Sequence, residues 1–297
     1  MKYIFAKNEL IEIIMPPLIG DCIMTFPLIN HLKLEHDLTL VCNEYVYEMV
    51  NFMQQPLKAK LLTADYLNSK IIIDFLSNNE SSNYIKYSKP KLSIGFEDGF
   101  WKYDLLLKQP SEYKAQPASS IFSYALELLG LDSNNCFDFS CSTKWQYTNQ
   151  TKILIAPSAG NIARCYSIED YILLGKDLYV KNIAFILGPN DKNLRSSIPL
   201  QFEIIETHNI EETIKILSSA KMIIASEGGF MHIAASYGIP LLGLFKVASV
   251  QNWFPFTSKY QIGLGDGRNN YYDITVTKMD VMLINEKAKE IYESIEN

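Results

Sequence analysis

The sequence predicts an α/β protein with two parallel sheets, one in each half of the chain. Short apolar runs alternate with segments whose apolar residues recur at helical spacing, which is the pattern of βαβ units. A polar stretch without apolar periodicity, residues 140–150, interrupts this alternation, which then starts again. A chain of 297 residues is long enough for about two domains. We therefore expect two βαβ domains of similar size.

The first half begins with a strand candidate at 11–15, which ends at the turn 16–21 and is followed by a helix candidate at 24–33. Residues 78–91 are polar, so loops are expected there. Gly130 closes the last helix of this half as a helix-stop residue. The other strand candidates are 38–42, 59–62, 70–75, 92–96 and 104–107, and the other helix candidates are 44–52 and 119–129.

The second half repeats the alternation, and this predicts a domain 1–145 followed by a domain 146–297. A last amphipathic helix, at 279–295, belongs to the second domain and could pack back on the first. The strand candidates are 152–156, 183–187, 202–205, 222–225 and 241–245, and the helix candidates before the last one are 168–179, 210–218 and 229–237.

Composition excludes several protein classes. With 48% hydrophobic and 20% charged residues, the chain has the profile of a soluble globular protein. A net charge of −6 argues against general nucleic-acid binding, which needs a cationic surface. Five cysteines without a CxxC pair indicate core thiols in a reducing compartment, and no metal or cofactor is expected. Neither a signal peptide nor a membrane-spanning run is recognisable, so a cytoplasmic location is expected.

Only three arginines occur among the 27 cationic residues, namely Arg164, Arg195 and Arg268. Because arginine grips phosphate with a planar fork, each is a candidate for anion binding. Open parallel sheets bind ligands beyond the carboxyl ends of their strands. The turns that follow the strands are therefore the places where a site is expected.

The first such turn contains Gly20 and Asp21, directly after the first strand candidate. Gly20 lets a substrate approach the backbone, and the carboxylate of Asp21 can accept a proton. The alternative is that Asp21 caps the helix that follows, because aspartate is a favoured cap residue.

The second turn, residues 156–167, opens the second half. Ser158 and the small residues around it could hold a phosphate with backbone N–H groups, and Arg164 would supply a cation. The turn is neither a Walker loop nor GxGxxG. Ser167 and Asp170 have the spacing of a capping box at the following helix. A purely structural loop is the alternative.

The third turn places Gly228 and Gly229 at an expected helix start, where bare N–H groups and the helix dipole favour a diphosphate. Glu227 would repel phosphate and is better placed to accept hydrogen bonds from a sugar or ribose hydroxyl. His232 could reach an anion, although a structural histidine is the alternative. In a fourth turn, Asp191 could accept a ligand hydroxyl or could form an ordinary turn or helix cap.

Taken in this order, the three main turns resemble glycosyltransferase family 9, the ADP-heptose:lipopolysaccharide heptosyltransferase family. Residues 20–33 read G-D-x5-P-x4-L-K, which resembles the family's N-terminal signature. Residues 157–166 resemble its P-G-(A/S) loop and the Lys-(R/H)-Trp-Pro element that follows. Residues 226–240 resemble its D-(S/T)-G-x-x-H-L-A-A…G-x-P element, the most specific of the three. The path through Leu244 and Phe245 to residues 253–255 also matches.

This resemblance implies a GT-B fold, in which two Rossmann-like domains with parallel sheets face a central cleft. It implies inverting, metal-independent transfer of a heptose or related sugar from an ADP-sugar to a lipopolysaccharide core or lipid A–Kdo type acceptor. Transient contact with the cytoplasmic face of the inner membrane would follow. The resemblance assigns Asp21 as the base, the first domain to the acceptor and the second to the nucleotide sugar. The substrate-binding candidates are then Gly20, Ser158, Arg164, Asp191, Glu227, Gly228, Gly229 and His232.

Departures from the family's pattern keep other functions open. Glu227 replaces an aspartate and Gly228 a hydroxyl residue, which motivates two alternatives: a binding protein of the same fold without turnover, or a transferase with a different nucleotide sugar. A dehydrogenase is disfavoured because neither half opens with GxGxxG. The further departures are Ser158 for glycine, Arg164 for lysine, Tyr166 for tryptophan and Ser167 for proline.

Overall fold

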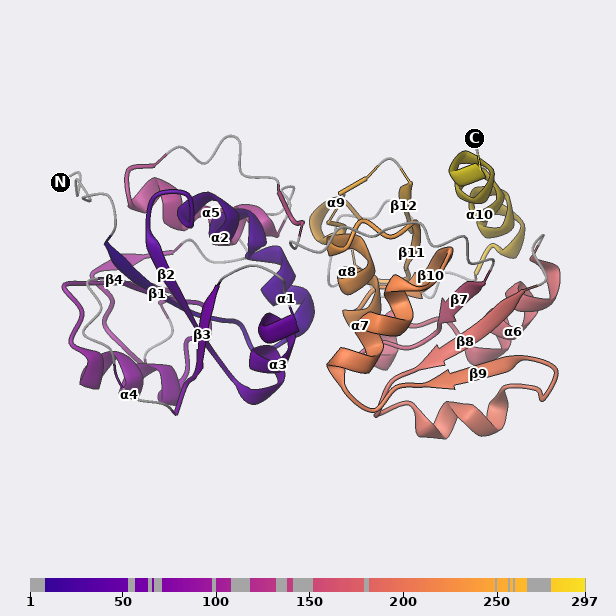
Figure 1. The fold of residues 1–297 in the computed structure, drawn as a ribbon, viewed down its shortest axis with the longest axis horizontal. Helices are drawn as coiled ribbons and strands as arrows, with labels where there is room; N and C mark the ends of the chain where they lie inside the picture. Colours follow the sequence, from indigo (N-terminus) through magenta and orange to yellow (C-terminus); the bar gives the residue numbers. More distant parts are fainter. Residues whose placement is uncertain are drawn as a thin grey trace. The chain divides into compact units, whose positions relative to one another are not determined.

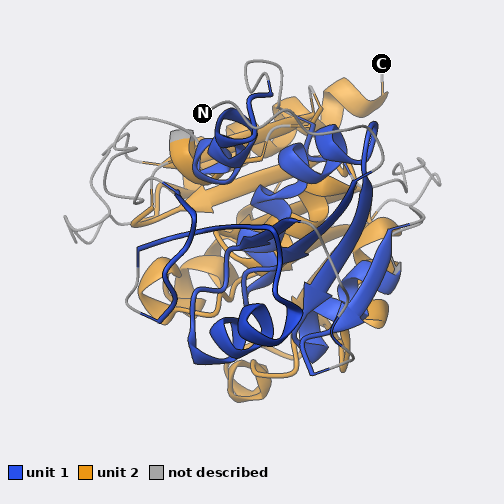
Figure 2. Ribbon diagram, turned by 90° about the vertical axis from the view of Figure 1, so that its left-hand side faces the viewer, with its two compact units in different colours: residues 1–141 blue, residues 142–297 orange. Residues whose placement is uncertain are grey.

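The computed structural model divides the chain into two compact units, residues 1–141 (unit 1) and 142–297 (unit 2), which Figure 2 shows in different colours. The domain boundary expected after residue 145 falls in a stretch outside the described residues. Each unit contains one six-stranded parallel sheet with helices between the strands, so the α/β fold class is confirmed. The structure describes residues 9–52, 57–63, 66, 71–97, 100–107, 118–131, 138–140, 152–178, 182–248, 250–255, 257–258, 260–265 and 279–296.

The sheet of unit 1 has the strand order β3-β2-β1-β4-β5-β6. All its pairs are parallel, and the register places Ile14 at the end of β1 opposite Val41 of β2 and Asp74 of β4. The two central strands are almost fully buried because helices cover both faces of a parallel sheet. The strands are β1 (Leu10–Ile14), β2 (Asp37–Cys42), β3 (Lys58–Leu61), β4 (Ile71–Asp74), β5 (Leu92–Gly95) and β6 (Leu105–Leu106).

The helices of unit 1 are α1 (Ile19–Met24), α2 (Phe26–Leu32), α3 (Glu44–Phe52), α4 (Asn79–Ser88) and α5 (Ser119–Leu128). Figure 1 shows α2 and α5 together on one side of the sheet and α4 on the other. Gly130 follows α5 with a φ of 76°, which confirms its role as the helix stop.

The segment after β1 differs from the sequence-based prediction of one helix at 24–33. The chain turns helical at Ile19 and is divided into α1 and α2 at Thr25. Pro27 causes the division, because a proline has no N–H to continue the hydrogen bonds of α1 and its ring crowds the preceding turn. Gly20 and Asp21 consequently lie in the first turn of α1.

The prediction of loops at 78–91 is wrong, because this segment contains α4. Asn78 and Ser81 form a reciprocal capping box, with the Asn78 side chain accepting from the backbone N–H groups of Glu80 and Ser81 at 2.9 Å each. The buried face of α4 is made largely of serines together with Tyr84 and Ile85, so the segment looks polar although it packs on the sheet.

Replacing Asn78 with alanine is expected to lower the unfolding free energy by about 1 kcal/mol, because two helix N–H groups lose their acceptor. Urea titration followed by circular dichroism measures the change. The exposed neighbour Asn79, changed to alanine, is the control and should have a smaller effect. Equal unfolding midpoints for the two variants would contradict a stabilising cap at Asn78.

The sheet of unit 2 has the order β9-β8-β7-β10-β11-β12. When the strands of each unit are numbered along the chain, both sheets have the strand order 3-2-1-4-5-6. The strands are β7 (Ile153–Ala156), β8 (Ile183–Leu187), β9 (Glu203–Glu206), β10 (Met222–Ser226), β11 (Leu241–Phe245) and β12 (Gln261–Gly265). The last of these was not predicted from the sequence.

Helices α6 and α10 pack together on one side of this sheet, and α7 packs with α8 on the other (Figure 1). The buried residues of α10 join the core of unit 2. The capping box of Ser167 and Asp170 is confirmed. The helices are η2 (Ile162–Arg164), α6 (Ile168–Asp177), η3 (Lys192–Ser197), α7 (Ile210–Ser218), α8 (Gly229–Ser236), α9 (Val250–Trp253) and α10 (Val281–Glu296), with η2 and η3 being 3-10 helices.

Candidate functional site

The strand order of unit 2 reverses between β7 and β10, which are neighbours at the middle of the sheet. Chains leaving these two strands run in opposite directions, and ligands of open α/β sheets bind at such a point. The loop after β7 carries Ser158 and Arg164, and the turn after β10 carries Glu227, Gly228 and Gly229. The sequence-predicted residues of the second half are therefore collected at this edge of the sheet.

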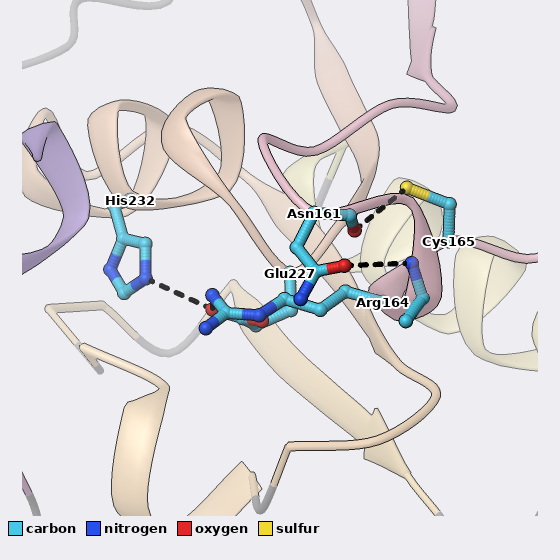
Figure 3. A network of polar contacts seen from close by, with 6 residues as sticks. Asn161, Arg164, Cys165, Glu227 and His232 are labelled. Atoms are coloured by element: carbon cyan, nitrogen blue, oxygen red, sulfur yellow. Dashed lines mark hydrogen bonds and ion pairs between the residues drawn. The ribbon is translucent and has the colours of Figure 1, made fainter. Parts of the chain in front are cut away.

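Glu227 is the centre of a buried polar cluster, with 2% of its side chain exposed. Its Oε1 accepts a hydrogen bond from Nη1 of Arg164 at 3.1 Å and lies 3.7 Å from Nε2 of His232. Figure 3 shows both side chains directed at this one carboxylate. The backbone N–H of Glu227 donates to the carbonyl of Leu244 at 3.0 Å, which fixes the residue to β11.

Two atoms of the cluster keep a free hydrogen-bonding position. Oε2 of Glu227 and Nδ1 of His232 are buried and have no hydrogen-bond partner among the described residues. Leaving such atoms unpaired costs free energy, so their presence in a folded protein requires an explanation. The arrangement offers an acceptor and a ring nitrogen to a polar ligand.

Arg164 reaches this cluster from a short, well-defined loop. The side chain of Asn161 accepts from the N–H of Ala163 at 3.0 Å, and its carbonyl accepts from the N–H of Arg164 at 3.0 Å. These bonds form the 3-10 helix η2 and set the direction of the Arg164 side chain. The Arg164 side chain is 27% exposed, so it lies between the buried Glu227 and the surface of unit 2.

The two glycines at the start of α8 have different structural roles. A Cβ atom on Gly228 would lie 2.9 Å from Cβ and 3.2 Å from Cα of Ala159, so the absence of a side chain lets the turn pack on the loop after β7. A Cβ atom on Gly229 would meet no heavy atom within 4 Å. No side chain caps α8, and its first N–H groups therefore remain accessible from the open side of Gly229.

Ser158 and Asp191 bind each other. Oδ2 of Asp191 accepts from Oγ of Ser158 at 2.6 Å and from the backbone N–H of Gly188 at 2.8 Å. The side chain of Asp191 makes no cap hydrogen bond to η3, but the N–H of Asp191 donates to the carbonyl of Gly188 at 3.0 Å, so Asp191 closes an ordinary turn and is not a side-chain helix cap. Its carboxylate instead joins the loop after β7 to the loop after β8.

Asp21 lies in unit 1, in the first turn of α1 and half-buried. The cap residue of α1 is Leu18, so the alternative in which Asp21 caps the helix is wrong. A helix N-terminus favours an ionised carboxylate, which is the form that accepts a proton. The loop that leads to Asp21 follows β1, one of the two strands at which the order of the unit 1 sheet reverses.

Sequence reasoning missed Asp74, which ends β4 beside the end of β1. Its Oδ2 accepts from the hydroxyl of Tyr103 at 2.7 Å, and its Oδ1 accepts from the N–H groups of Leu76 and Ser77. Burial raises the pKa of the Asp74 carboxyl, and these hydrogen bonds oppose the rise. The signal in the sequence was an acidic residue at the end of an apolar run, Ile71 to Asp74.

A second missed residue is Lys246, which follows β11 and donates from Nζ to the carbonyl of Cys165 at 2.8 Å. Two lysines of unit 1 form ion pairs: Lys58 pairs with Asp37 at 2.8 Å, and Lys60 pairs with the buried Glu12 at 2.6 Å.

The described residues contain no cluster of three or more His, Cys, Asp or Glu side chains that could hold a metal ion. In the same ranges, no helix combines the length and apolar character needed to cross a membrane.

The model of glycosyltransferase family 9 (heptosyltransferase) matches residues 42–279 of the chain. Among solved structures, the chain is similar to a glycosyl transferase family 9 protein from Veillonella parvula DSM 2008, with a TM-score of 0.78, 14% identity and coverage of 99% of this chain and 100% of that one.

It is also similar to Escherichia coli ADP-heptose lps heptosyltransferase II, with a TM-score of 0.72, 14% identity and coverage of 97% and 100%. For E. coli heptosyltransferase WaaC with ADP the TM-score is 0.66, at 13% identity and coverage of 96% and 99%. No curated protein sequence matches the chain significantly. The likeness of these structures confirms the expected fold, two Rossmann-like units of the GT-B type.

Proposed function

The chain belongs to glycosyltransferase family 9, and from this membership and the cluster at Glu227 we propose that it transfers a sugar from a nucleotide-diphosphate donor to a glycan acceptor. Unit 2 binds the donor in this proposal, and unit 1 provides the acceptor side and the base. The single observation that carries it is the buried Glu227, which lies with Arg164 and His232 at the start of α8 and keeps one oxygen unpaired.

The geometry of unit 2 supports separate binding positions for the diphosphate and the sugar of the donor. The N–H groups at Gly229 and the guanidinium of Arg164 attract the diphosphate, since a helix N-terminus and an arginine both favour negative charge. Oε2 of Glu227 accepts a hydrogen bond from a sugar hydroxyl, and Nδ1 of His232 is a second polar contact. The sugar of the donor therefore lies nearest to Glu227.

Asp21 acts as the base in a single displacement. Its carboxylate takes the proton of the acceptor hydroxyl while that oxygen forms a bond to the anomeric carbon. The bond from the anomeric carbon to the diphosphate oxygen breaks, and the leaving nucleoside diphosphate carries the electron pair. Attack from the side opposite the leaving group inverts the anomeric centre. Arg164 and the start of α8 stabilise the charge that develops on the leaving group, without a metal ion.

The donor is an ADP-sugar, and the transferred sugar is a heptose or a related sugar. The acceptor is a lipopolysaccharide core or another surface glycan, which brings the enzyme into transient contact with the cytoplasmic face of the inner membrane. These assignments rest on the family and on the solved heptosyltransferases that are similar to the chain.

Incubation with ADP-heptose and a lipid A–Kdo acceptor tests the proposal, and mass spectrometry should detect the acceptor with one additional sugar. A thermal-shift series with ADP, UDP and GDP identifies the base, because a ligand that binds only the folded state raises the unfolding temperature. We expect the largest shift with ADP. ADP binding without product from any sugar acceptor would favour the alternative of a binding protein that has lost turnover.

Replacing Arg164 with alanine is expected to weaken ADP binding about 10- to 100-fold, the usual contribution of a hydrogen bond between charged groups. Arg164→Lys should have an intermediate effect, because lysine keeps the charge but loses the planar fork. Isothermal titration measures both. Arg195→Ala is the control, because Arg195 pairs with Glu206 and 57% of its side chain is exposed. An unchanged dissociation constant in R164A would remove Arg164 from the donor site.

A further inference from the structure

Lys246 occupies a special position relative to the candidate donor site. It is the first residue after β11, and its ammonium donates to the carbonyl of Cys165 at 2.8 Å. Cys165 follows Arg164 directly in the loop after β7. The side chain thus connects two loops that lie on opposite sides of β10, because β10 is between β11 and β7 in the sheet.

This connection places the ammonium close to the donor residues. A side chain that spans from β11 to the loop after β7 has to pass the end of β10, where Ser226 and Glu227 are located. Glu227 is itself hydrogen-bonded through its N–H to Leu244, two residues before Lys246. The charge of Lys246 is also close enough to lower the pKa of the Cys165 thiol, against the larger rise caused by burial.

A diphosphate that binds beside Arg164 and Glu227 needs a second cation, because of the charges already present there. Arg164 is paired with the carboxylate of Glu227, so these two side chains together contribute no net charge to a bound diphosphate. Asp191, at the next loop, adds a negative charge. Lys246 contacts a neutral carbonyl, and within the described part of the chain its ammonium has no carboxylate partner. Its charge is therefore available to a bound diphosphate.

We propose that Lys246 binds the diphosphate of the donor directly, as a second cation beside Arg164. This inference rests on the proposed function and names a residue that neither the sequence motifs nor their departures single out. An ammonium has three donors, so Nζ can keep its bond to the Cys165 carbonyl and still donate to a phosphate oxygen.

Two variants separate the charge from the loop contact. Lys246→Gln keeps an N–H donor that can reach the Cys165 carbonyl but removes the charge, whereas Lys246→Met removes both. Isothermal titration with ADP, AMP and adenosine should give about 10- to 100-fold weaker ADP binding for both variants, with adenosine affected less than twofold. Lys215→Gln removes a charge from the exposed surface of α7 and should leave ADP binding unchanged. Thermal unfolding of each variant verifies that unit 2 is folded.

A double variant distinguishes direct binding from an effect exerted through Arg164. If Lys246 contacts phosphate, K246Q should weaken ADP binding by a similar factor in the wild type and in the R164A background. If K246Q has no effect in R164A, Lys246 only positions the arginine, and the proposal is wrong. Wild-type affinity for ADP in K246Q also overturns it, while the proposed function stands. Failure of the unmodified protein to bind any nucleoside diphosphate overturns both.

Discussion

Replacing Asp21 with asparagine is expected to reduce the rate of sugar transfer about 100- to 10,000-fold, which is the usual contribution of a general base. Asparagine has nearly the same shape as aspartate but cannot accept the proton of the acceptor hydroxyl. The affinity for ADP should remain unchanged, since the donor residues belong to unit 2. Steady-state kinetics together with titration of ADP measures the two effects separately.

Glu44 offers a matched control for this experiment. It is an exposed carboxylate in the first turn of α3, as Asp21 is a carboxylate in the first turn of α1. Glu44→Gln also removes one negative charge from the first turn of a helix in unit 1 and should leave the transfer rate unchanged. Undiminished turnover in D21N would exclude Asp21 as the base, whereas an equal loss in both variants would indicate a general electrostatic effect of unit 1.

Adding a side chain to Gly228 is expected to have the second large effect. The Cβ atom of alanine or serine at this position would lie 2.9 Å from Cβ of Ala159, closer than carbon atoms pack in proteins. Overpacking of this kind costs about 1–3 kcal/mol of stability. The loop after β7 has to move to relieve it, and ADP binding should weaken because Arg164 is held by that loop.

The neighbouring glycine provides the comparison. Gly229→Ala should leave the unfolding temperature nearly unchanged, since its Cβ would meet no heavy atom within 4 Å, but should weaken ADP binding by occupying the space in front of the α8 N-terminus. Combining Gly228→Ser with Ala159→Gly should recover stability, because the closest contact is removed. A Gly228→Ser variant as stable as the wild type would contradict the packing explanation.

The alternation of buried strands and amphipathic helices was sufficient to predict the architecture. Runs such as Ile71 to Ile73 and Ile153 to Ala156 are apolar throughout, and a fully buried parallel strand has this pattern. The helix α4 was missed because its buried face consists largely of serines, which carry no apolar period. The strand β12 was missed because glycines alternate in it, at positions where the side chains of Phe254 and Val250 occupy the space of a Cβ atom.

The sequence predicted which residues belong to the candidate site but not which of them are in contact. Turns at the ends of strands indicated Arg164 and Glu227 separately, yet their hydrogen bond joins residues 63 positions apart in the chain. Such a contact depends on the order of the strands, which local patterns do not encode. Lys246 was missed for the same reason, since its partner Cys165 lies 81 positions away.

The bridge formed by Asp191 has a consequence for the thermodynamics of binding. Because one carboxylate oxygen holds both Ser158 and the N–H of Gly188, the loops after β7 and β8 are already ordered before a ligand arrives. A phosphate loop that is disordered in the free protein loses conformational entropy on binding, and that loss opposes affinity. Here this part of the ordering is completed during folding, so the binding entropy should be dominated by the release of water from the ligand and the site.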